Sequence, residues 1–79
     1  MAFRIVLYTK EGCTLCSETR AILERLKGEF ALDVTEVDIT SEPELHERFK
    51  NVIPVIAIEG RATLLAPISE FRLRRALED

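Results

Sequence analysis

A change of hydrophobic period within the first 27 residues limits the folds that this chain can adopt. Residues 3–8, FRIVLY, are nearly all apolar, β-branched or aromatic, which is typical of a central strand buried on both faces. The segment from about Cys13 to Lys27 instead repeats its apolar positions with a helical spacing, at Thr19, Ile22, Leu23 and Leu26. The sequence therefore predicts a buried strand followed by an amphipathic helix.

The rest of the chain continues this alternation of strands and helices. Residues 32–39 alternate apolar and polar side chains and predict a second strand. A short helix should follow and end near Asn51, with Ser41 and Glu44 spaced as a capping box and Pro43 in the first turn.

The last third of the chain predicts a hairpin and a closing helix. Residues 54–65, PVIAIEGRATLL, place a two-residue Glu59-Gly60 turn between two apolar runs. Residues 69–78 form a final helix, in which Glu70 and Arg74 are spaced for an ion pair. The order βαβαββα predicts an α/β fold, with parallel strands in the first βαβ unit and an antiparallel hairpin in the same sheet. We expect one domain over residues 1–79, with a four-stranded mixed sheet flanked by three helices.

Composition excludes several classes of function. Eleven basic and fourteen acidic residues are mixed along the chain, so no stretch offers the basic surface that DNA or RNA requires. The first apolar run is too short for a membrane span or a signal-peptide core. We therefore expect a monomeric cytoplasmic protein with no nucleic-acid or membrane partner. Two cysteines in that reducing compartment are more often catalytic or metal-binding than structural.

The two cysteines stand where a helix begins. Cys13 lies at or beside the N-cap and Cys16 lies one turn further on. Unpaired N–H groups and the helix dipole favour a thiolate there, and a thiolate is the nucleophile of disulfide exchange. Gly12 allows a tight turn before the helix, and Lys10 adds positive charge, which Glu11 opposes. Cys13 could therefore attack a disulfide, and Cys16 could resolve the mixed disulfide.

The segment YTKEGCTLC resembles the active-site segment of the glutaredoxins and of the wider thioredoxin superfamily, with Lys10 three residues before the first cysteine. VIPV, residues 52–55, resembles a second motif of that superfamily, in which a proline enters the third strand. The resemblance implies a thioredoxin-like fold and a cis peptide bond before Pro54, beside the cysteines. It also implies that Ile53 offers its backbone to the substrate chain.

The sequence departs from the glutaredoxins at two places. Thr14 and Leu15 replace the usual Pro-Tyr between the cysteines, where they would face the substrate, so the redox potential of the family does not transfer. No Gly-Gly follows Gly60, although glutaredoxins use that pair to hold the glutathione carboxylate. Glutathione is therefore a doubtful cofactor, and the implied redox group is a Cys13–Cys16 disulfide. The chain is most similar to short glutaredoxin-like proteins that lack the glutathione site.

The sequence favours a thiol-disulfide oxidoreductase that acts on a protein disulfide and is recycled by a thioredoxin reductase or another dithiol. Cys13 and Cys16 would be catalytic, whereas Lys10, Thr14, Leu15, Ile53 and Pro54 would contact the substrate. Two other classes stay open. Two thiolates could carry soft Cu(I) or, between two copies, Zn(II). A non-catalytic module could instead bind a partner chain on the face around Pro54.

Overall fold

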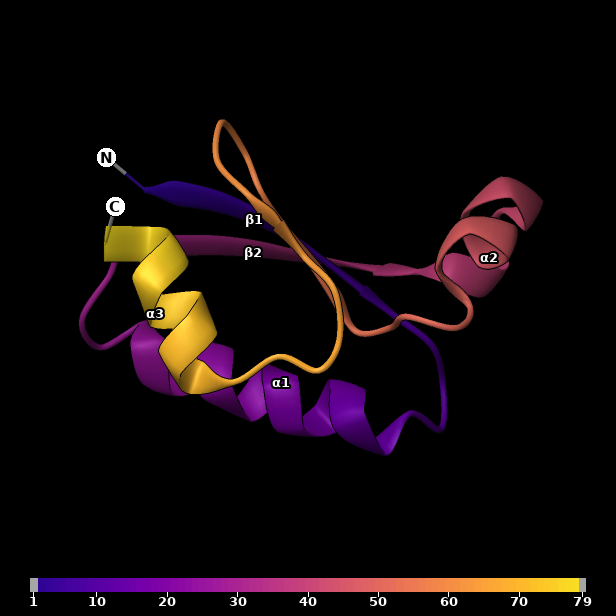
Figure 1. Ribbon diagram of the computed structural model, residues 1–79, viewed down its shortest axis with the longest axis horizontal. Helices are drawn as coiled ribbons and strands as arrows, with labels where there is room; N and C mark the ends of the chain where they lie inside the picture. Colours follow the sequence, from indigo (N-terminus) through magenta and orange to yellow (C-terminus); the bar gives the residue numbers. More distant parts are fainter. Residues whose placement is uncertain (1, 79) are drawn as a thin grey trace.

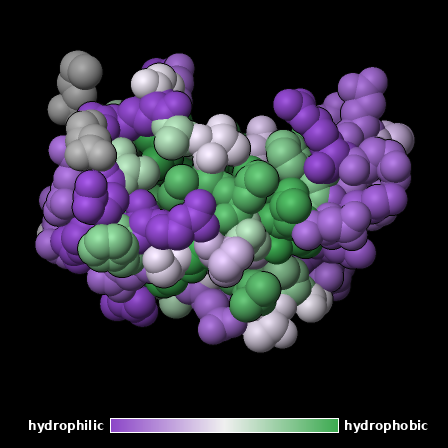
Figure 2. Space-filling model, in the orientation of Figure 1, coloured by the Kyte–Doolittle hydropathy of each residue, from purple (hydrophilic) through white to green (hydrophobic). Residues whose placement is uncertain are grey.

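The computed structural model describes residues 2–78, and its elements follow the predicted order (Figure 1). The elements are β1 (Phe3–Thr9), α1 (Thr14–Leu26), β2 (Leu32–Asp38), the 3-10 turn η1 (Ile39–Ser41), α2 (Pro43–Phe49), β3 (Val55–Ile58), β4 (Thr63–Leu64) and α3 (Glu70–Glu78). The sheet order is β2-β1-β3-β4, with β1 parallel to β2 and antiparallel to β3, and with β4 antiparallel to β3. The predicted mixed α/β sheet is confirmed. In the same view, apolar side chains gather over the middle of the molecule, between hydrophilic surfaces at its two ends (Figure 2).

The first strand is central, as predicted, but it is not buried on both faces. Ile5 and Leu7 are fully buried, whereas Arg4 is exposed and Val6 and Tyr8 are only half-buried. Successive side chains of a strand point to opposite faces of the sheet, so one face is covered and the other is partly open. Because residues 3–8 are nearly all apolar, the sequence did not indicate this alternation between a covered and an open face.

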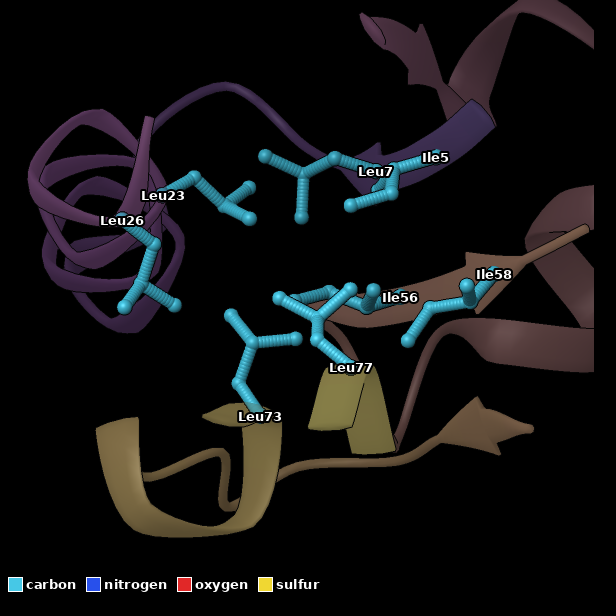
Figure 3. Packing of buried hydrophobic residues seen from close by; sticks show 8 residues of the cluster. All are labelled: Ile5, Leu7, Leu23, Leu26, Ile56, Ile58, Leu73 and Leu77. Atoms are coloured by element: carbon cyan, nitrogen blue, oxygen red, sulfur yellow. The ribbon is translucent and has the colours of Figure 1, made fainter. Parts of the chain in front are cut away.

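The core lies on the face that α1 and α3 cover together (Figure 3). Its buried side chains come from two strands and two helices: Ile5, Leu7, Leu23, Leu26, Ile56, Ile58, Leu73 and Leu77. Neither helix could bury its apolar stripe alone, because each is too short to be stable in water without tertiary packing. The two helices and the sheet therefore stabilise one another.

The second face of the sheet is covered only at one end. Tyr8 contacts Phe49 of α2, with 4.8 Å between their ring centroids. Away from this contact, a hollow of about 330 Å³ opens over the strands, lined among others by Val6, Thr35 and Ala57. A seven-residue α2 is too short to reach further across the sheet.

One local prediction was wrong. Ser41 does not cap α2, because it lies in η1 and its hydroxyl donates to the carbonyl oxygen of Asp38 at 2.7 Å. The N-cap is Glu42, which makes no side-chain capping bond, and α2 ends at Phe49 with Lys50 as its C-cap, close to the predicted end near Asn51.

The predicted two-residue turn at Glu59 and Gly60 is present. The N–H of Arg61 donates to the carbonyl oxygen of Ile58 at 2.9 Å, which closes the turn around these two residues, and the N–H of Ile58 donates to the carbonyl oxygen of Ala62 at 3.0 Å. Gly60 has a φ of +75°, a conformation that glycine adopts without steric cost. The turn that the sequence predicts at Glu59 and Gly60 is therefore confirmed.

An ion-pair network joins α3 to the end of α1. Arg74 binds Glu29 at 2.7 Å and Glu70 at 3.2 Å, and Arg25 binds Glu70 at 2.9 Å. The predicted Glu70–Arg74 pair is confirmed, and it is part of a larger set. Hydrogen bonds from Arg74 lower the pKa of Glu29, and hydrogen bonds from Arg25 and Arg74 lower the pKa of Glu70.

Among residues 2–78, none of the helices combines the length and the apolar character needed to cross a membrane. The start of β1 and the end of α3 lie at the same end of the molecule, and α1 begins at the other end (Figure 1).

Truncating the core side of α3 should destabilise the fold. Leu73 is fully buried, so Leu73→Ala should lower the free energy of unfolding by about 2–5 kcal/mol, because it removes buried methyl groups and leaves a cavity. Phe71→Ala on the same helix is the control, since Phe71 is 69% exposed, and it should cost no more than about 0.5 kcal/mol. Urea unfolding measures both. Equal losses would show that α3 is not held by its buried stripe.

The ion-pair network should give stability that depends on pH. Because folding lowers the pKa of Glu29 and Glu70, their contribution is present above the unfolded value and is lost as the pH falls through the folded values. Arg74→Gln should therefore lower the melting temperature at about pH 7, and its difference from the parent protein should shrink below about pH 4. Arg75→Gln on the same helix is the control. A difference that stays constant over the whole range would contradict the assignment.

Candidate functional site

A tight turn brings Cys13 from the end of β1 to the start of α1. The N–H of Cys13 donates to the carbonyl oxygen of Lys10 at 3.3 Å, and Gly12 between them has a φ of +81°. Cys13 has extended backbone angles and is the N-cap, while its carbonyl oxygen accepts the N–H of Ser17. The predicted positions of the turn, of Gly12 and of the N-cap are confirmed.

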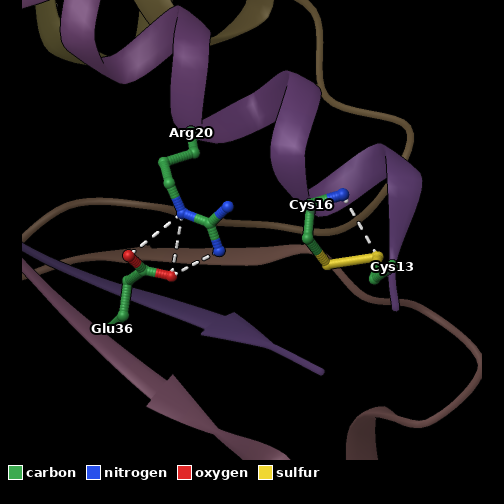
Figure 4. Close-up of a disulfide and its surroundings, with 4 residues drawn as sticks. All are labelled: Cys13, Cys16, Arg20 and Glu36. Carbon is green, nitrogen blue, oxygen red and sulfur yellow. Dashed lines mark hydrogen bonds and ion pairs between the residues drawn. A yellow bond between two sulfur atoms is a disulfide. The ribbon is translucent and has the colours of Figure 1, made fainter. Parts of the chain in front are cut away.

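Cys13 and Cys16 form a disulfide across the first turn of α1, with their Cα atoms 5.2 Å apart (Figure 4). The backbone N–H of Cys16 donates to Sγ of Cys13 at 3.1 Å. Cys13 is half-buried, whereas Cys16 is only 1% exposed. A reagent from solvent therefore reaches Cys13 first, and the helix backbone directs a hydrogen-bond donor at the same sulfur.

A hollow of about 440 Å³ opens in front of Cys13, and we call it the cysteine hollow. Its lining includes Lys10, Gly12, Cys13, Thr14, Ser17 and Arg20. The predicted contacts Lys10 and Thr14 are therefore beside the reactive sulfur. The charge of Lys10 also acts on Asp38, whose pKa is lowered chiefly by hydrogen bonds from the hydroxyl and N–H of Thr40 and to a smaller extent by Lys10.

An ion pair at the edge of the cysteine hollow ties α1 to β2 (Figure 4). Both carboxylate oxygens of Glu36 accept from Nε of Arg20 at 3.1 Å, and Nη2 of Arg20 donates to Oε1 at 2.7 Å. These bonds to Glu36 raise the pKa of Arg20. Both side chains are nearly half exposed, so the pair orients α1 more than it stabilises the fold.

The peptide bond between Ile53 and Pro54 is cis, as the resemblance implies. Pro54 is buried and shares a second hollow, of about 110 Å³, with Leu15 from between the cysteines. We call this hollow the side pocket. Ile53 is half-buried and lines neither hollow. The structure therefore divides the predicted contacts into two groups and leaves Ile53 outside both.

Sequence reasoning missed the other residues of both hollows. Ser17 and Arg20 are four and seven residues after Cys13, so helical spacing alone could have placed them beside it. The side pocket is also lined by Glu18, Thr19 and Ile22 of α1 and by Ala66, Pro67 and Ile68, and the Ala66–Pro67 bond is also cis. No local signal marks that second cis bond, because most X–Pro bonds are trans.

Over residues 2–78, histidine, cysteine and acidic side chains do not gather in threes or more at any place that could hold a metal ion.

Comparison with known proteins agrees with this architecture. The family model of the Glutaredoxin-like domain (DUF836) matches residues 4–78. Proteins of Mycobacterium bovis and Mycobacterium tuberculosis, both described as uncharacterized, are 29% identical over 76 residues, which cover 90% of this chain and 78% of each relative. The X-ray structure of a structural-genomics target from X. campestris has a TM-score of 0.81 at 23% identity and covers 94% of this chain and 95% of that chain, which supports the thioredoxin-like fold. Since the family model spans nearly the whole sequence, the chain belongs to the glutaredoxin-like domain family.

Proposed function

We propose that this protein is a thiol-disulfide oxidoreductase that reduces a protein disulfide. The Cys13 thiolate attacks one sulfur of the substrate disulfide, and the other substrate sulfur leaves as a thiolate that takes up a proton. Cys16 then loses its proton to solvent and attacks Sγ of Cys13, which releases the second substrate thiol. Two electrons pass to the substrate, and the protein ends with the Cys13–Cys16 disulfide.

The observation that carries this proposal is the unequal exposure of two bonded sulfurs at a helix start. Cys13 is accessible and accepts the N–H of Cys16, so its thiolate would be stabilised as it forms and as it leaves. Cys16 is buried, and its sulfur is bonded to that of Cys13. An ordered dithiol mechanism requires this difference between an attacking and a resolving thiol.

The segment before α3 supports a dithiol reductant rather than glutathione. Pro67 has no N–H to donate, and the N–H of Ala66 already bonds to the carbonyl oxygen of Val52 at 3.1 Å. The hydroxyl of Ser69 accepts the N–H of Arg72 at 3.1 Å. Neither Ala66 nor Pro67 therefore offers a backbone donor to a glutathione carboxylate. We accordingly propose recycling by a thioredoxin reductase or a similar dithiol, in the reducing cytoplasm.

Cys16→Ser should trap a mixed disulfide, and Cys13→Ser should not. In Cys16→Ser the accessible thiolate still attacks, but no second thiol resolves the product. Each reduced variant is incubated with a peptide disulfide, alkylated and analysed by mass spectrometry without reductant, with the double serine variant as the control. Equal trapping by the two single variants would exclude an ordered mechanism.

Glutathione should behave as an ordinary monothiol toward the Cys13–Cys16 disulfide. We expect the rate of reduction to rise linearly with its concentration and to match that of glutathione ethyl ester, within about twofold, because the Gly-Gly pair that holds the glycine carboxylate in glutaredoxins does not follow Gly60. Stopped-flow measurement of the free thiols formed gives both rates. Saturation together with a clear preference for the free acid would show that another surface binds the tripeptide.

A further inference from the structure

The side pocket is linked to the disulfide through Leu15, which lines the pocket and stands between the two cysteines in the sequence. Leu15 forms one wall from the helix turn that carries both cysteines, and Pro54 forms another from the start of β3. The remaining apolar lining comes from α1 and from the segment before α3: Ile22, Ala66, Pro67 and Ile68. In the view of Figure 2, the apolar middle of the molecule reaches the surface between its two hydrophilic ends.

The size of the side pocket limits what it can hold. Its volume is about 110 Å³, whereas sites for drug-sized ligands typically have about 300–1,000 Å³. It therefore suits one side chain better than a tripeptide. Glu18 is the charged residue of its lining and is exposed, so it opposes a carboxylate at the entrance.

The wall of the side pocket is fixed by α3. The guanidinium of Arg72 donates through Nη1 to the carbonyl oxygen of Leu65 at 3.0 Å and to that of Pro67. The bond from Ala66 to Val52 fastens the same segment to the chain before β3. A segment held from both sides keeps its shape without a ligand, so little ordering is required when a side chain enters.

We propose that the side pocket takes one uncharged aliphatic side chain adjacent to the substrate cysteine, and that Arg72 is a positioning residue for its wall. This inference rests on the proposed function, and it names the substrate class as protein segments with an aliphatic residue next to the reactive cysteine. Leu15 stands between the two bonded cysteines in the sequence and lines the pocket, so we expect a chain bound at Cys13 to bring a neighbouring residue to the opening.

The test uses short peptides whose single cysteine carries 2-nitro-5-thiobenzoate as a mixed disulfide. The protein is first reduced with a dithiol, which is then removed. Cys13 attacks the peptide sulfur and the coloured nitrothiobenzoate leaves as a thiolate; Cys16 then attacks Cys13, and the peptide leaves and takes up a proton. Leucine, alanine or glutamate stands immediately before or immediately after the cysteine.

At one of the two flanking positions, leucine should react roughly tenfold faster than alanine, and glutamate should react more slowly than alanine. One contrary result is that the three peptides react at equal rates at both positions, while nitrothiobenzoate is still released much faster than by Cys13→Ser. That result would overturn the proposed role of the side pocket but not the proposed oxidoreductase function. Release no faster than for Cys13→Ser would overturn both proposals.

Two pairs of variants connect this preference with the side pocket. Glu18→Lys should raise the ratio of the glutamate rate to the alanine rate several-fold, whereas Glu24→Lys on the same helix should leave that ratio unchanged. Arg72→Ala should reduce the leucine preference toward the alanine rate, whereas Arg75→Ala on the same helix should keep it. If Arg72→Ala left the preference for leucine over alanine unchanged, Arg72 would not be a positioning residue. If Glu18→Lys left the ratio of the glutamate rate to the alanine rate unchanged, the flanking residue of the peptide would bind outside the side pocket.

Discussion

The packing of α1 on the sheet is the constraint on which the site depends. Leu23 and Leu26 are almost fully buried against β1, β3 and α3, so the axis of the helix is fixed relative to the strands. The N-terminus of the helix is thereby held just beyond the end of β1, where the turn through Gly12 delivers Cys13. Arg20 and Glu36 add a polar contact between the same helix and β2. The reactive sulfur is thus positioned by a buried hydrophobic contact that lies about three to four helical turns away from it.

Much of this arrangement could be predicted from the sequence, because it follows from periodicity. The apolar spacing of Leu23 and Leu26 specifies a helix that must lie on a sheet, and the short loops specify which strands are neighbours. The same periodicity places Cys13 at the helix start and Cys16 on its buried side. The cis bond before Pro54 came from the family resemblance alone, since no local property of the residues requires it.

The parts that could not be predicted depend on contacts between distant residues. Ser41 and Glu44 have the spacing of a capping box, yet η1 takes Ser41 out of position, and nothing within those few residues indicates that turn. The burial of the second sheet face depends on how far α2 extends across it. The apolar sequence of β1 carries no information about the length of α2. Arg72 is a charged residue on an exposed helix face, and its role became visible only when the carbonyl groups of Leu65 and Pro67 were located. Helix spacing could have found Ser17 and Arg20 but not the wall of the side pocket.

The location of the chain ends has a practical consequence for handling the protein. The beginning of β1 and the end of α3 are together at one end of the molecule, and the start of α1 with its disulfide is at the opposite end (Figure 1). Much of the molecule, including the body of α1, therefore lies between these two element ends and the start of α1 (Figure 1). A fusion partner, an affinity resin or an electrode surface joined at either end would leave Cys13 facing the solution. The protein can accordingly be immobilised by one end while a large folded substrate approaches the other.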